Sequence, residues 1–197
     1  GKQGYFTVTA WTSATIVTAN IISEIPGAAN QYHSEWSREA FDDSNGPAHV
    51  TYHESRKVYA TTNDSPQKVW LSRTFIYNDF GDSVDEGEDD DDIATDESGF
   101  DLELSTDQAN EIKWLSSGES LATGTFGGEF TSVSPSGSSL TRKNKNSKRQ
   151  SGWGSEFIKV MKMGNYVYYV QRGARRLREL FYFFDNDNYK STDMTAL

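Results

Sequence analysis

Short runs of apolar and aromatic residues, separated by turn-forming residues, recur along this chain. Three stretches share one layout of strand-like run, polar turn and strand-like run: His49 to Thr62, Glu111 to Thr125 and Phe157 to Gln171. A further apolar run follows each of them, at 68–73, 128–134 and 176–184. β-Branched and aromatic residues dominate these runs, and such residues favour pleated, half-buried surfaces. The pattern predicts an all-β fold of antiparallel, blade-like sheets.

The spacing of these stretches suggests a repeat. Their leading residues Val50, Ile112 and Ile158 lie about 60 and then about 45 residues apart. Small antiparallel sheets that recur at such intervals are typical of β-propeller blades, in which each sheet covers the face of its neighbour. A β-sandwich is the alternative, because it would contain similar strand pairs without regular recurrence.

The ends of these runs indicate three regions. Residues 1–26 read as a strand pair that turns near Thr12 and Ser13 and ends at Pro26, as the close of a preceding small β domain. Residues 27–48 read as a connecting loop anchored by Trp36 and Phe41, and residues 49–197 as the blade-like domain. From their places in the strand runs, the following side chains are expected to be mostly buried: Trp70, Ile112, Trp114, Leu121, Val167, Val170 and Phe181.

A predicted hairpin near the end of the chain carries a cluster of arginines. Tyr166 to Val170 and Leu177 to Phe184 are expected to pair antiparallel, because Gly173 between them can adopt a positive φ. Guanidinium groups pair with carboxylates or phosphates, and bidentate carboxylate pairing fixes orientation. We therefore expect at least two of the four to form ion pairs with Asp or Glu, within the chain or across a subunit boundary; contact with phosphates is the alternative. The four are Arg172, Arg175, Arg176 and Arg178.

The charge of the chain bears on its partners. The formal net charge is −10, there are no cysteines, and no apolar run approaches the roughly 18 residues that span a bilayer. A protein that grips DNA through its backbone is normally basic, so a nucleic-acid-binding module is disfavoured. The absence of cysteine rules out disulfides and thiolate metal sites in this chain, and we expect no membrane-spanning segment.

Two charged segments interrupt the strand runs. Residues 85–97 carry nine carboxylates, and residues 142–149 carry five basic side chains. Both read as exposed loops. For the acidic loop the alternatives are charge pairing with another subunit, or a bound cation without the spacing of an EF-hand. The basic loop could instead pair with carboxylates of another subunit or contact phosphates. The charge-docking candidates in the acidic loop are Asp89, Asp90, Asp91 and Asp92.

No catalytic, cofactor or metal site is expected. His49 and His53 share one face of a predicted strand but lack a third ligand, so a structural role is favoured over a metal site. Glu129 and Asp107 could be posed as a glycosidase pair, which is a weak inference among 29 acidic residues. The glycines of 124–130 lie between strand runs and predict a tight hairpin. Of the tryptophans, Trp70 and Trp114 are expected in the core and Trp153 on the surface.

The order of the segments resembles one family. Asn165 to Leu197, with its "VQRG-x-RR-x-RE" pattern followed by an aromatic strand and "Y-x-S-x-D-x-T-x-L", is similar to a signature of the nozzle of short-tailed phages, also called the tail tubular or packaged-DNA stabilisation protein. Similar segments precede it in the family's order: 4–22, 35–41, 46–60, 66–73, the acidic stretch, 105–115 and 121–130. Ala174 departs from the pattern, where a second glycine is expected. Family members are longer, so this chain looks like one segment of a larger protein.

The resemblance implies a structural virion protein rather than an enzyme. Such a chain would form a homo-oligomeric ring, usually of six subunits, docked below the portal–adaptor complex of a phage tail assembled in the host cytoplasm. DNA would pass through the lumen as cargo, and the net negative charge would keep it from adhering. Two alternatives remain: a receptor- or glycan-binding module of a tail fibre, which predicts an exposed aromatic pocket, and a glycan-hydrolysing propeller, which predicts convergent carboxylates.

Overall fold

The computed structural model describes residues 6–21, 41, 44–81, 95–104, 106, 110–134, 138–184 and 188–195. These residues form fourteen strands in four antiparallel sheets. None of the described segments forms a helix with the length and hydrophobicity that a bilayer crossing needs. The all-β prediction is confirmed.

The chain divides into two compact units. One contains a twisted hairpin of β1 (Phe6–Ser13) and β2 (Ile16–Ile21). The predicted strand pair is therefore present, with its turn at Ala14 and Thr15 rather than at Thr12 and Ser13. The other unit contains three four-stranded sheets.

Each of these three sheets is a simple meander in chain order. The first has β3 (His49–His53), β4 (Arg56–Ala60), β5 (Lys68–Leu71) and β6 (Phe100–Glu103). The second has β7 (Ile112–Ser117), β8 (Leu121–Thr125), β9 (Gly128–Val133) and β10 (Asn146–Ser151). The third has β11 (Met161–Met163), β12 (Tyr166–Val170), β13 (Leu177–Phe183) and β14 (Asn188–Asp193).

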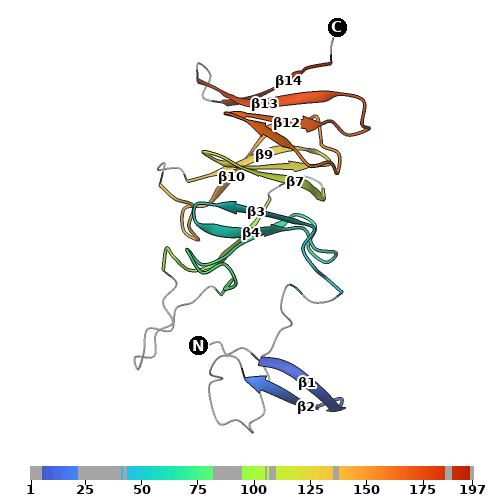
Figure 1. Ribbon diagram of the computed structural model, residues 1–197, viewed down its shortest axis with the longest axis vertical. Helices are drawn as coiled ribbons and strands as arrows, with labels where there is room; N and C mark the ends of the chain where they lie inside the picture. The colour runs from blue at the N-terminus through green and yellow to red at the C-terminus, as the bar shows by residue number, and fades with distance from the viewer. Residues whose placement is uncertain are drawn as a thin grey trace. The chain divides into compact units, whose positions relative to one another are not determined.

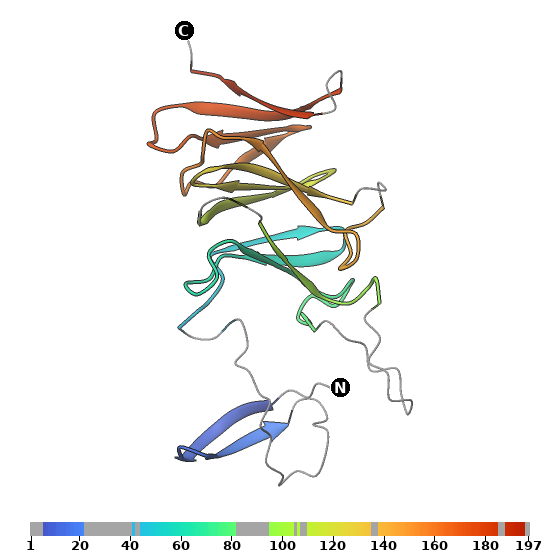
Figure 2. The same cartoon turned by 180° about the vertical axis from the view of Figure 1, so that it is seen from behind.

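The three sheets of this unit are stacked in chain order, with the second in the middle (Figure 1). The first strand of the first sheet, β3, lies against β7, and the last strand of the second sheet, β10, lies against β14. Figure 2 shows the same order from behind. No sheet closes on itself in the described residues.

Two hydrophobic cores hold the stack together. The first, between the first and second sheets, includes Val58, Leu71, Phe100, Ile112 and Phe130. The second, between the second and third sheets, consists of buried Trp114, Ala122, Val167, Tyr169 and Leu180. Strand β8 is buried along its whole length, because the middle sheet has a neighbour on each face.

A bulge and a glycine adapt the middle sheet to its two neighbours. The register of β7 against β8 shifts between Ile112 and Trp114, so Ile112 joins the first core although Trp114 joins the second. Gly124 lies directly beneath the indole, and a Cβ at this position would lie 2.0 Å from Trp114 Cε2. Only a residue without a side chain lets the indole approach the strand this closely.

The predicted strand pairs are present in all three sheets, and their fourth strands, β6, β10 and β14, were not predicted. The C-terminal hairpin is confirmed, with Val167 opposite Leu180 and Val170 opposite Leu177. The hairpin predicted in 124–130 is also confirmed, with its turn at Phe126 and Gly127. Of the side chains expected to be buried, five are; Val170 and Phe181 are half-buried. Both of these residues lie on the face of the third sheet that points away from the second sheet, so no described sheet covers them.

Two predictions were wrong in detail. The segment 142–149 is not a loop throughout, because β10 begins at Asn146 and pairs with β9. Lys148 and Arg149 of β10 are exposed, and the backbone of this strand pairs with β9, which the count of charged residues does not reveal. Ile158 does not lead a strand either: it is exposed, and β11 begins three residues later. In the predicted alignment of the three repeats, the third therefore begins at Met161 rather than at Ile158.

Candidate functional site: the arginine turn and the polar network beneath it

The β12–β13 turn presents the arginine cluster. Gly173 has φ +84° and Ala174 has φ 54°, so two consecutive residues adopt left-handed conformations. The turn is closed by Ala174 N–H donating to Gln171 O at 3.0 Å and Gln171 N–H donating to Arg176 O at 2.9 Å. The Glu156 carboxylate accepts a further bond from Gly173 N–H at 3.1 Å. The turn is thus held from within and from the preceding segment.

The four arginines of this turn have different environments. Arg176 is exposed and forms an ion pair with Asp193 at 3.2 Å. Arg172 lies over the ring of Phe126, with its guanidinium carbon 5.6 Å from the ring centroid. Arg175 is exposed and makes no ion pair with a described residue. Arg178 is buried. The structure therefore shows one of the expected ion pairs, and a second within the assembled particle stays a prediction.

The burial of Arg178 corrects its assignment as a docking residue. Only 2% of its surface is exposed. Its Nε donates to Gln171 Oε1 at 2.7 Å and its Nη1 to Ser191 O at 3.3 Å. The guanidinium lies 3.7 Å from the centroid of the Trp153 ring, a cation–π contact worth roughly 0.5–2 kcal/mol. The reason is strand alternation: Arg178 and Leu180 share the face of β13 that packs on the second sheet.

Glu129 of β9 supplies a carboxyl group to the same buried region. Its side chain has no exposed surface, and its two oxygens accept hydrogen bonds from the hydroxyls of Ser151 and Ser155, the latter at 2.9 Å. Tyr169, also fully buried, lies nearby and its hydroxyl bonds Ser191 Oγ at 2.7 Å. Residues from the second and third sheets therefore meet in one polar network beneath the arginine turn.

Burial dominates the proton equilibria of this network. Burial raises the pKa of the Glu129 carboxyl, although the hydroxyl donors and the charge of Arg178 oppose the shift. Burial, followed by the charge of Glu129, raises the pKa of the Tyr169 phenol. At the surface, the hydroxyl and backbone N–H of Thr195, then Arg176 and Arg178, lower the pKa of Asp193. A carboxyl without solvent access is not reachable by a substrate, so Glu129 does not support the glycosidase pair.

A second set of polar contacts joins the first and second sheets. His49 Nε2 lies 3.0 Å from Ile112 O, and His53 Nδ1 lies 3.0 Å from Ser117 Oγ. Burial lowers the pKa of both imidazoles, which favours their neutral forms. Among the described residues no group of three or more His, Asp or Glu side chains is placed to hold a metal ion. The histidines therefore connect β3 to β7, in agreement with the structural interpretation.

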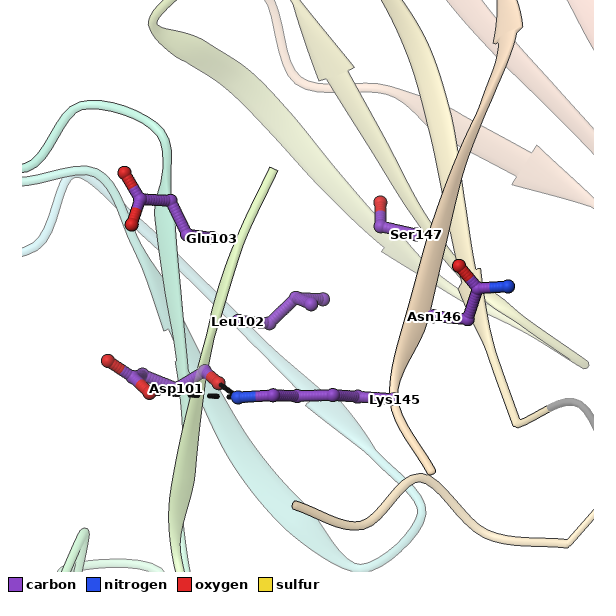
Figure 3. A pocket seen from close by; sticks show the side chains of 6 residues that line it. All are labelled: Asp101, Leu102, Glu103, Lys145, Asn146 and Ser147. Atoms are coloured by element: carbon purple, nitrogen blue, oxygen red, sulfur yellow. Dashed lines mark hydrogen bonds and ion pairs between the residues drawn. The ribbon is translucent and has the colours of Figure 1, made fainter. Parts of the chain in front are cut away.

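Strands β6 and β10, each at the edge of its sheet, border a hollow of about 450 Å³. Figure 3 shows Lys145 extending across it from the start of β10 to Asp101 of β6. Its Nζ donates to Asp101 O and lies 3.8 Å from Asp101 Oδ1, while Lys68 pairs with the same carboxylate. Burial opposes ionisation of Asp101, but the hydrogen bond and charge of Lys68, supported by Lys145, lower the pKa. A basic residue of 142–149 thus joins two sheets of one chain.

Arg56 performs a similar role inside the first sheet. Its buried guanidinium donates from Nη1 to Ser72 O at 2.6 Å and Ser98 O at 2.8 Å, and from Nη2 to Asp96 O at 2.6 Å. These bonds tie the end of the acidic segment to the sheet. The docking candidates Asp89 to Asp92 themselves lie outside the described residues, as does Asp107.

Sequence reasoning missed the buried partners of the arginine turn. Glu129, Tyr169 and Gln171 are spread over β9, β12 and the turn, and only the packing of two sheets brings them together. The usable signal was strand alternation: Glu129 neighbours the core residue Phe130, so it must point to the opposite face. That face is buried only because a third sheet covers it.

The chain was compared with known proteins. No family model matches it, and a search of curated proteins found no match.

Proposed function

We propose that this chain is a structural module of a short-tailed phage nozzle, which forms rings through its charged turns and conducts DNA in its lumen. The observation that carries the proposal is the arginine turn: an exposed cationic hairpin held on a stack of sheets. The ordered resemblance of the sequence segments to the nozzle family supports it. The activity would be mechanical and electrostatic, and we propose no catalytic role.

The base of the hairpin is rigid, and this suits it to docking. Arg178 anchors β13 to Gln171 of the turn and to Trp153 of the segment after β10, and Glu156 holds the turn backbone. Arg175 and Arg176 then project from a fixed support, so less conformational entropy is lost when they meet a partner. Arginine favours bidentate carboxylate partners, and the neighbouring subunit of an acidic protein would supply these.

The stacked meanders are compatible with propeller blades. The first strands of the first two sheets, β3 and β7, are neighbours, as are the last strands of the second and third sheets, β10 and β14, an arrangement that successive blades around one axis would share. The outer face of the third sheet carries Tyr166, Tyr168, Phe181 and Phe183, side chains that a further blade would cover. We propose that the blade-like sheets belong to a β-propeller, and that the protein contacts the portal–adaptor complex and other tail proteins.

Charge reversal tests the proposal. Arg175→Glu combined with Arg176→Glu should abolish ring assembly, because the docking charges change sign while Arg178 still anchors the hairpin. The matched control reverses two exposed lysines elsewhere, Lys143→Glu and Lys159→Glu, for the same change in net charge. Negative-stain electron microscopy and sedimentation measure the rings, and thermal melting confirms folding.

Two outcomes would contradict the proposed docking role. Intact rings in the Arg175 and Arg176 variant, with DNA leaking or being held abnormally, would place these arginines at the lumen and its phosphates. Loss of rings in the control variant as well would show that net charge, rather than the turn, controls assembly.

A further inference from the structure

A groove of about 400 Å³ opens between the second and third sheets, away from the arginine turn. The end of β7 and its turn to β8 form one wall, and β12, β13 and the β11–β12 turn form the other. Ala122, Val167 and Leu180 are buried at its base. The volume lies within the roughly 300–1,000 Å³ that is usual for small-molecule sites.

Tyrosines supply the aromatic surface of this groove. Tyr182 remains 41% exposed, so part of its ring surface is open to a ligand. Tyr182 contacts Tyr189 edge to face at 5.4 Å, and Tyr189 is fixed by a 2.8 Å hydrogen bond between its hydroxyl and Ser120 Oγ. The Tyr166 ring, 5.6 Å from Phe181, belongs to the opposite face of the third sheet. The rings of Tyr182 and Tyr189 are thus ordered before any ligand arrives, which lowers the entropic cost of binding.

The rest of the lining is polar and carries both charges. It includes Ser116, Ser117, Glu119, Lys162 and Asn165. Lys162 crosses from the third sheet to donate to Ser117 O at 2.7 Å, and Gly118 leaves room for it, since a Cβ there would lie 3.1 Å from Lys162 Nζ. The groove therefore combines an exposed tyrosine ring with hydroxyl, amide, ammonium and carboxylate groups in its lining.

We infer that this groove binds a saccharide. A pyranose ring has an apolar face of C–H groups, which stacks on a tyrosine, and a periphery of hydroxyls, which need donors and acceptors of both kinds. The Ser, Asn, Lys and Glu side chains of the lining provide these. A nucleic acid fits less well, because the one lysine of the lining already bonds Ser117 O and Glu119 would repel phosphates. The inference is independent of ring assembly.

Binding to a panel of immobilised oligosaccharides, followed by calorimetry with the best binder, tests the inference. Tyr182→Ala should weaken binding about tenfold or more, as truncation of a central aromatic anchor does. Tyr182→Phe should retain most of the affinity, because it keeps the ring face. The matched control is Tyr77→Ala, an equally exposed tyrosine of the connection between β5 and β6.

Three results would overturn the inference. The first is no binding to any saccharide of the panel at about millimolar concentration. The second is binding that Tyr182→Ala leaves unchanged, and the third is an equal loss in Tyr77→Ala. Because Tyr182 is half-exposed, we expect its variants to fold, and thermal melting verifies this.

Discussion

Gly124 shows how the absence of one side chain makes room for a core residue of the neighbouring strand. Its missing side chain makes space for the Trp114 indole, which packs toward the third sheet. We expect Gly124→Ala to lower the free energy of unfolding by about 1–3 kcal/mol, since an added methyl overpacks this contact. Urea denaturation measures the loss. Gly46→Ala is the control, because nothing lies within 4 Å of the Cβ it would add; equal losses in both variants would contradict the explanation.

Glu129 predicts a pH dependence. Because burial raises its folded pKa above the ordinary value of 4.5, the folded state holds the proton more tightly than the unfolded state. The contribution of Glu129 to stability is therefore full below pH 4.5 and declines as pH rises through the folded pKa. Glu129→Gln removes this titration, so the stability of wild type relative to the variant should fall as pH increases from acid to neutral. Urea melts across this range measure it, and a pH-independent difference would show that Glu129 titrates normally.

The C-terminal hairpin shows what element-scale patterns can and cannot predict. Aromatic runs on either side of Gly173 predicted its two strands, and the structure pairs them as expected. The same residues did not predict that Arg178 turns inward, because "RRLREL" reads as an exposed charged stretch until the face of β13 is known. Alternation then places Arg178 beside Leu180 on the buried face.

The backbone of this hairpin's turn is strained at Ala174, and a substitution can test this. Ala174 has φ 54°, which costs an alanine about 1 kcal/mol relative to an unstrained conformation. Ala174→Gly should raise the free energy of unfolding by a few tenths up to about 1 kcal/mol, since the greater freedom of glycine in the unfolded chain offsets part of the gain. Gly173→Ala, at φ +84°, should lower it. Chemical denaturation distinguishes the two, and a destabilised Ala174→Gly protein would contradict the strain argument.

At the scale of the whole molecule, the middle sheet is the part most protected from solvent. Strands β8 and β9 have neighbours on both faces, whereas β11 is an exposed edge strand. Amide hydrogen exchange should therefore be slowest in 121–133 and faster in 161–163, because opening β8 or β9 requires both cores to separate. Mass spectrometry of exchanged peptides measures this. Equal protection in β8 and β11 would indicate that the three sheets open as one unit.

The sequence by itself determined the class of the fold, the strand pairs and the hairpin of the arginine turn. These follow from local alternation and from turn residues, which act within a few positions along the chain. It also indicated that Trp70 and Trp114 would be buried and that the histidines were structural.

Tertiary structure alone decided which faces of the strands are covered. The polar network of Glu129, Tyr169 and Arg178, the link from Lys145 to Asp101, and the tyrosine groove all join residues of different sheets. Their contacts depend on the order in which the sheets stack, and periodicity within a strand carries no information about the sheet that packs against it. The edge strand β10 escaped prediction for a related reason: its residues are polar, and its hydrogen bonds to β9, rather than its side chains, make it a strand.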